Sequence, residues 1–161
     1  MPPPSVPIPE GGNNPTGKLP VENDFLNPWS EDLDEQYALK TFLGKTPEGA
    51  EEMFRRNFIC YYEDLGAMKA TAFRFYLLPA IRYLLSEAAS GDSDAANTFC
   101  YMLEERLRLD GESLTPVVPI VLYAIRQVLD HFARFDCSPE IYGDVPARYR
   151  SLAQRLEAMK T

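Results

Sequence analysis

The chain has 161 residues, a length typical of one domain, and 45 % of them are hydrophobic, which excludes a disordered composition for most of it. Its net charge of −8 argues against non-specific binding to nucleic acid or an anionic membrane. The three cysteines form no CxxC pair, which excludes a zinc ribbon or a thioredoxin-type site and favours reduced, mostly buried thiols in a cytoplasmic protein. They are Cys60, Cys100 and Cys137. Neither a signal peptide nor a membrane-spanning apolar run is expected.

Residues 1–28 are rich in proline, glycine and asparagine. Proline lacks a backbone donor and glycine raises the entropic cost of ordering, so this composition predicts a flexible arm ahead of a single helical domain at 29–161. The stretch from Leu19 to Leu39 contains neither lysine nor arginine. Its acidic residues are Glu22, Asp24, Glu31, Asp32, Asp34 and Glu35. It has two interpretations: a solvated helix start, where carboxylates are favourable, or a docking surface for a basic partner.

Capping residues, glycines and prolines divide the remaining chain into expected helices. These run from Ser30 or Asp32 to Gly44, from Thr46 to Arg56, from Phe58 to Leu65, from about Phe73 to Gly91, from Asp92 or Ser93 to about Leu109, from Thr115 to Phe135 and from about Ala147 to Met159. No segment shows the alternating pattern of a strand. The sequence therefore predicts an all-α, compact bundle of about six helices.

The segment after residue 72 has the clearest helical pattern, with apolar residues at i, i+3, i+4, i+7 and i+8. These are Phe73, Tyr76, Leu77, Ala80, Ile81, Leu84 and Leu85. Phe75 and Leu78 make the opposite face apolar as well, so we expect this helix to be central and the most buried. Pro79 is expected to kink it or split it in two.

Two long-range features suggest how the helices are arranged. At an offset of 40 residues, five positions are identical between the two halves of the domain, which indicates two similar helical hairpins. The last helix carries a basic face, with Arg148, Arg150, Arg155 and Lys160. This face could contact the acidic N-terminal segment.

Motifs for catalysis or ligand binding are incomplete. Gly44-Lys45-Thr46 lacks the first glycine and the preceding strand of a phosphate-binding loop. Asp92-Ser93-Asp94 lacks the turn glycine and closing glutamate of a calcium loop. The single histidine, His131, has no glutamate three residues before it, and a pairing with Cys137 is not favoured. We therefore predict no metal and no cofactor, and the sequence favours binding over catalysis.

Aromatic side chains, arginines and carboxylates gather between residues 61 and 82. The candidate binding residues are Tyr62, Glu63, Asp64, Arg74, Tyr76 and Arg82. One interpretation is a buried hairpin in which the arginines pair with Glu63 or Asp64. The other is a partner-binding groove lined by the two tyrosines and the two arginines, since these residue types contribute strongly to interfaces. Adjacent carboxylates on a helix point about 100° apart, which disfavours acid–base catalysis by Glu63 and Asp64 together.

The same segment, YYEDLGAMKATAFRFYLLPAIRYLL, resembles a family of small uncharacterised bacterial proteins with an E-D-L…M…A-F-x-x-Y-L-P-A pattern in a helical domain. Leu78 is an extra residue relative to that pattern and shifts Pro79 by one position. The resemblance implies a bacterial all-helical domain and no established activity. Some small acidic bacterial proteins act as immunity proteins against toxins, an analogy of size and charge.

These observations favour a non-catalytic, immunity-like binding or regulatory protein of the bacterial cytoplasm, with a protein partner that is basic and with neither nucleic acid nor membrane as partner. Two alternatives stay open. One is an enzyme with a pocket beside the kinked central helix, and the other is a structural subunit of a homo-oligomer.

Overall fold

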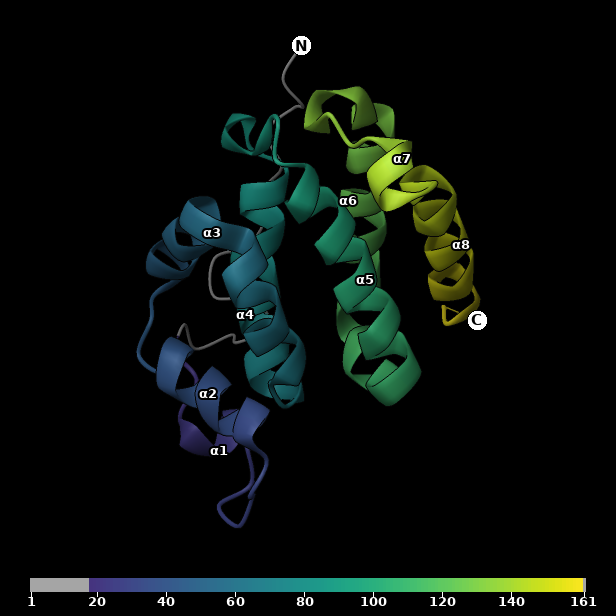
Figure 1. The fold of residues 1–161 in the computed structure, drawn as a ribbon. Coiled ribbons are helices and arrows are strands. Elements are labelled where there is room, and N and C mark those ends of the chain that lie inside the picture. Colours follow the sequence, from purple (N-terminus) through teal and green to yellow (C-terminus); the bar gives the residue numbers. More distant parts are fainter. Residues whose placement is uncertain (1–17, 161) are drawn as a thin grey trace.

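The computed structural model describes residues 18–160, which form helices and turns without a strand (Figure 1). The α-helices are α1 (Glu22–Phe25), α2 (Leu33–Phe42), α3 (Pro47–Ala67), α4 (Ala70–Leu84), α5 (Ser93–Asp110), α6 (Val118–Asp130), α7 (Pro139–Tyr142) and α8 (Val145–Ala158). Three 3₁₀ helices connect them: η1 (Glu87–Ala89), η2 (Gly111–Val117) and η3 (Phe132–Phe135). The prediction of an all-α bundle is confirmed, and α2 to α6 with α8 are the helices of ten residues or more.

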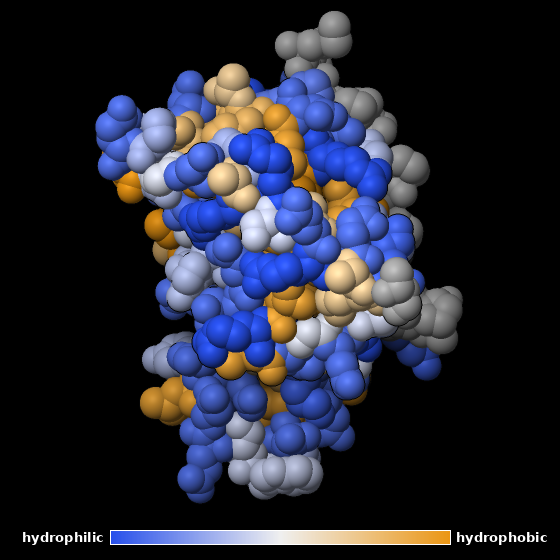
Figure 2. Space-filling model, turned by 90° about the vertical axis from the view of Figure 1, so that its right-hand side faces the viewer, coloured by the Kyte–Doolittle hydropathy of each residue, from blue (hydrophilic) through white to orange (hydrophobic). Residues whose placement is uncertain are grey.

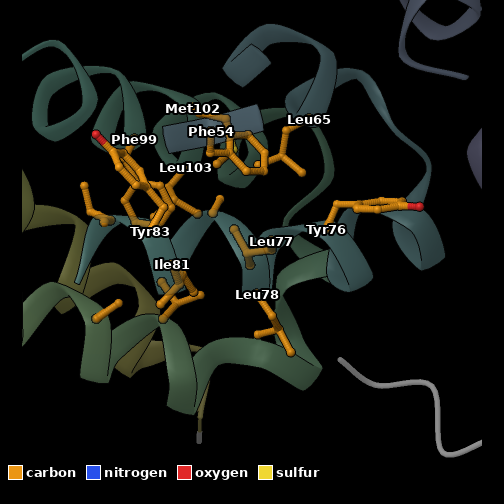
Figure 3. Packing of buried hydrophobic residues seen from close by; sticks show 14 of the residues in the cluster. Phe54, Leu65, Tyr76, Leu77, Leu78, Ile81, Tyr83, Phe99, Met102 and Leu103 are labelled. Carbon is orange, nitrogen blue, oxygen red and sulfur yellow. The ribbon is translucent and has the colours of Figure 1, made fainter. Parts of the chain in front are cut away.

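Helix α4 is the centre of the core, as its two apolar faces predict. Its side chains point to both sides in Figure 3: Leu78 and Ile81 lie on one side, and Phe54 of α3 lies on the other. Apart from Arg74 and Arg82, every residue of α4 from Ala72 to its end is buried. The helix continues through the buried Pro79, so the expectation that it splits there is wrong. Packing on both faces compensates for the hydrogen bond that the proline lacks.

The folded part of the chain begins earlier than residue 29. Phe25, in the short helix α1, is fully buried, and its ring centroid lies 5.9 Å from that of Tyr76. The Lys69 backbone N–H donates to the Phe25 carbonyl oxygen at 2.9 Å. The predicted arm boundary at residue 28 is therefore wrong for residues 20–28, because the buried Phe25 ring and hydrogen bonds from Lys69 to Asn23 and Asn27 anchor this segment. The rest of that predicted arm, residues 1–17, lies outside the described residues.

Several helix ends follow the capping signals. Asp32 accepts hydrogen bonds from the backbone of Asp34 and Glu35 at the start of α2, and Thr46 accepts one from Gly49 at the start of α3. The break expected between the two helices at residue 57 is confirmed: α3 consists of two helical parts that meet at a kink at Asn57, where φ is −165° and ψ is 79°.

The helix expected from Thr115 to Phe135 is shorter at both ends. Thr115 and Pro116 belong to η2, and α6 begins at Val118 with Pro119 in its first turn. A helix can start at either Pro116 or Pro119, because each proline fits the first turn of a helix, and α6 starts at the later of the two. The helix ends at Asp130, and the final residues of the expected span form η3.

Helices α3 and α4 pack along each other as a hairpin, whereas α5 and α6 are joined mainly through η2 and α8. The acidic helices α1 and α2 lie on the opposite side of the molecule from α8 (Figure 1). The expected contact between the acidic segment and the basic last helix is therefore wrong, and Arg148 instead pairs with Glu104 of α5 at 2.7 Å. The face over α7 and α8 is mostly hydrophilic (Figure 2). None of the helices within residues 18–160 combines the length and apolar character of a membrane span.

Candidate functional site

The C-terminal part of α3 lies between α2 and α5, and the three helices enclose an open hollow of about 640 Å³. We call this hollow the acidic groove. Its polar lining consists mainly of carboxylates and tyrosines: Asp32, Asp34, Glu35, Glu63, Asp64, Glu105 and Asp110, with Tyr37, Tyr62 and Tyr101. Three of the sequence-predicted residues, Tyr62, Glu63 and Asp64, are among them.

Asp64 lies close enough to two other carboxylates of the groove, Glu63 and Asp34, to feel their charges. Its carboxyl is half-buried, and burial together with the charges of Glu63 and Asp34 raises its pKa. No cation within residues 18–160 forms an ion pair with Asp64, Glu63 or Asp34. Glu63 accepts a hydrogen bond from the Tyr62 hydroxyl at 3.2 Å, and burial followed by the Glu63 charge raises the pKa of that phenol. These groups form an uncompensated negative site.

Other carboxylates of the groove already have structural partners. Asp32 caps α2, and Glu35 accepts a hydrogen bond from the Ser30 hydroxyl at 2.7 Å. Glu105 forms an ion pair with Arg108 at 2.7 Å. The carboxylates available to a cationic ligand are therefore concentrated on the α3 side and at Asp34.

Arg106 is the cation among the lining residues; it pairs with Asp110 at 3.5 Å and holds the groove in shape. It is only 6 % exposed and donates to the Gly66 carbonyl at 3.1 Å, to the Met68 carbonyl and to the Ser113 hydroxyl at 2.7 Å. Its guanidinium carbon lies 4.1 Å from the centroid of the Phe73 ring. Burial lowers the pKa of Arg106 to about 10. These contacts tie the end of α3 to α5 and thereby position the groove.

The remaining predicted site residues do not reach the groove. Tyr76 is fully buried, its ring points away from Leu78 and Ile81 (Figure 3), and burial raises its pKa to about 12. Arg74 donates to the Ser113 carbonyl at 3.3 Å, and Arg82 forms an ion pair with Glu51 at 3.4 Å. The prediction of a groove lined jointly by two tyrosines and two arginines is therefore wrong: Tyr62 lines the acidic groove, whereas Tyr76, Arg74 and Arg82 do not.

The alternative interpretation, in which the arginines pair with Glu63 or Asp64, is also wrong, because Arg74 contacts Ser113 and Arg82 contacts Glu51. Both arginines lie on α4, and no residue of α4 lines the groove. The enzyme pocket beside the central helix, one of the alternatives from the sequence, would therefore be a different hollow from the acidic groove.

The groove also contains residues that the sequence reasoning missed. Tyr37 and Leu109 are 63 % and 71 % exposed, and Tyr101 is 48 % exposed. A usable signal was present on α5, where Tyr101, Glu105 and Leu109 recur every four residues and so share one face. Arg106 gave no comparable signal, because its sequence context resembles that of the exposed Arg108.

The reactive residue types lie elsewhere in the fold. Cys100 is buried, and burial raises its pKa to about 12. Cys60 is exposed, so the expectation of mostly buried thiols is wrong for it. His131 is half-buried at the end of α6, as expected. Within the described part of the chain, no group of three histidine, cysteine or acidic side chains is placed to hold a metal ion.

No family model matches the chain, and neither the curated proteins nor the solved structures give a match. The chemistry of the acidic groove therefore carries the functional argument.

Proposed function

We propose that this chain is a non-catalytic binding protein whose acidic groove engages a positively charged segment of a partner protein. The observation that carries the proposal is the set of Asp34, Glu63 and Asp64, which share one hollow and have no ion pair within residues 18–160. Lysine or arginine side chains would compensate these charges through charge-assisted hydrogen bonds. Tyr37, Tyr62 and Tyr101 offer ring faces to the same cations.

The net charge of −8 supports the same proposal at longer range. An acidic protein attracts a basic partner before contact and so accelerates association, an effect that salt screens. An immunity-like role in the bacterial cytoplasm, where a small acidic protein neutralises a basic toxin, is the biological setting that we propose on the analogy of size and charge.

The test is a titration of a fluorescently labelled arginine- and lysine-rich peptide into the full chain, with anisotropy as the readout. The paired variant Glu63→Gln/Asp64→Asn should weaken binding at least about tenfold, because it removes two uncompensated charges of the groove. The matched control is Glu48→Gln/Glu87→Gln, which removes the same charge from exposed positions outside the groove.

The control should retain most of the affinity, and added salt should weaken binding by the wild-type chain steeply. An equal loss in both paired variants would mean that only the overall charge matters, and it would overturn a specific role for the groove. Binding that is unaffected by either pair would overturn the proposal as well.

A further inference from the structure

Exposed apolar side chains border the acidic groove on two sides. On α2, Tyr37 lines the groove, and Leu33, one turn earlier on the same face, is 67 % exposed. On α5, Tyr101 and Leu109 line it and are 48 % and 71 % exposed. Large apolar side chains at this exposure are an observation independent of the charges, and their gathering beside one hollow is typical of an interaction surface.

The α5 wall has a definite order. Tyr101, Glu105 and Leu109 follow one another at intervals of four residues, so an apolar, an acidic and an apolar group lie along one face. With a rise of about 1.5 Å per residue, Tyr101 and Leu109 are about 12 Å apart along the helix axis. Because Glu105 already pairs with Arg108, the available carboxylates are Glu63, Asp64 and Asp34. A complementary segment must therefore present two apolar groups at about this separation, with basic groups between them that face these three carboxylates.

An α-helix meets this requirement directly. Two of its residues seven positions apart lie on one face at about 10.5 Å along the axis, and residues three or four positions from each lie between them. An extended segment would need partners for its backbone N–H and C=O groups. The groove walls are helices whose backbone groups bond internally, so a strand would find few such partners there.

We infer that the acidic groove binds an amphipathic helix of the partner, with two apolar residues seven positions apart and lysine or arginine between them. The inference rests on the proposed function and adds the secondary structure and the residue pattern of the partner segment. Tyr101 and Leu109 contact the apolar pair, and Glu63, Asp64 and Asp34 contact the basic side chains.

The experiment compares three labelled peptides of about sixteen residues with nearly the same composition, long enough to form a helix. The first has the apolar pair and the intervening arginines on one helical face. The second has the same residues in shuffled order, and the third is the first with a central proline that breaks the helix. The wild-type chain should bind the first peptide at least about tenfold more tightly than the other two.

The paired variant Tyr101→Ser/Leu109→Ser should remove this preference and bind all three peptides alike. The matched control is Ile59→Ser/Ile141→Ser, whose side chains are 48 % and 75 % exposed and lie outside the groove. The control should keep the preference. All four side chains are 48–75 % exposed and none belongs to the hydrophobic core, so neither variant removes core packing.

The outcomes separate the two proposals. If all three peptides bind the wild-type chain equally and Glu63→Gln/Asp64→Asn weakens all of them, the inferred helix is overturned and the proposed function stands. If no peptide binds, both are overturned. Sedimentation of the chain alone tests a second copy as occupant: a dimer that Tyr101→Ser/Leu109→Ser converts to monomer would overturn the inference in favour of a homo-oligomer.

Discussion

The hydroxyl of Tyr76 lies 3.0 Å from the Phe42 carbonyl oxygen and 2.8 Å from that of Lys45, at the end of α2. In the sequence this tyrosine fits two patterns, the inward stripe of the central helix and a group of residue types that favour interfaces. The periodicity was the better guide, because it reflects the packing of a whole helix, whereas residue type alone does not fix which side is exposed. Tyr62 fits only the second pattern, and it does line the groove.

Replacing Tyr76 with phenylalanine should destabilise the fold by about 1–3 kcal/mol, because the ring is kept while the one hydroxyl proton shared between the buried Phe42 carbonyl and the part-buried Lys45 carbonyl is lost. Urea denaturation followed by circular dichroism measures the change. Tyr101→Phe is the matched control, since this side chain is 48 % exposed and should tolerate the loss of its hydroxyl. Equal stability of Tyr76→Phe and the wild-type chain would contradict the assigned hydrogen bonds.

Asp64 predicts a dependence of stability on pH. Its pKa is raised in the folded chain, first by burial and then by Glu63 and Asp34, so the folded state binds the proton more tightly than the unfolded state. The stability that this group contributes is therefore present below its ordinary pKa of 3.8 and is lost as the pH rises through the folded-state pKa.

Asp64→Asn should consequently raise the melting temperature near neutral pH, and the difference from the wild-type chain should disappear below the ordinary aspartate pKa of 3.8. Thermal unfolding across this pH range measures it, with the exposed Glu87→Gln as the control. A lower melting temperature at neutral pH would show that Asp64 stabilises the fold. The expected gain would mean that the chain keeps an ionised groove at a cost in stability, as functional sites often do.

At the scale of single elements, local signals placed helix starts better than helix ends. Asp32, Thr46 and Asp92 cap α2, α3 and α5 as expected, because an N-cap uses residues that are adjacent in sequence. The end of α4 depends on distant groups: Arg134 donates to the carbonyls of Leu84 and Ser86 at 2.6 Å and 3.0 Å. Local sequence contains no sign of such a contact, and the four-residue helix α7 is too short to give a periodic pattern.

Two glycines allow a paired test of these boundaries. Gly91 has φ +84° between η1 and α5, and a Cβ there would meet no atom within 4 Å, so the cost of Gly91→Ala is purely conformational. We expect a loss of about 1–2 kcal/mol. Gly111 has φ −59°, where alanine is unstrained, so Gly111→Ala should leave stability unchanged or raise it by about 0.4–1 kcal/mol. Chemical denaturation measures the free energy of unfolding of both variants. Changes of the same sign and size in the two would contradict the assigned backbone conformations.

For the whole molecule, the fold class could be predicted because apolar periodicity over six long helices is a strong signal. The acidic groove could be predicted only in part. Tyr62, Glu63 and Asp64 are neighbours in sequence and stood out together, but Tyr37 and Tyr101 join them only through the packing of α2 and α5 against α3. Arg106, which fixes that packing, resembles any surface arginine of a helix until its buried position is known.

The positions of α2 and α8 on opposite sides of the molecule have a consequence for how it meets other molecules (Figure 1). The first turn of α2 and the residues just before it contain Glu31, Asp32, Asp34 and Glu35, and the exposed Arg150 and Arg155 belong to α8. These two sides of the molecule therefore differ in charge, with the more negative surface at the start of α2. Within a Debye length of about 8–10 Å, a cationic molecule experiences a torque that turns this surface toward it before the two molecules touch.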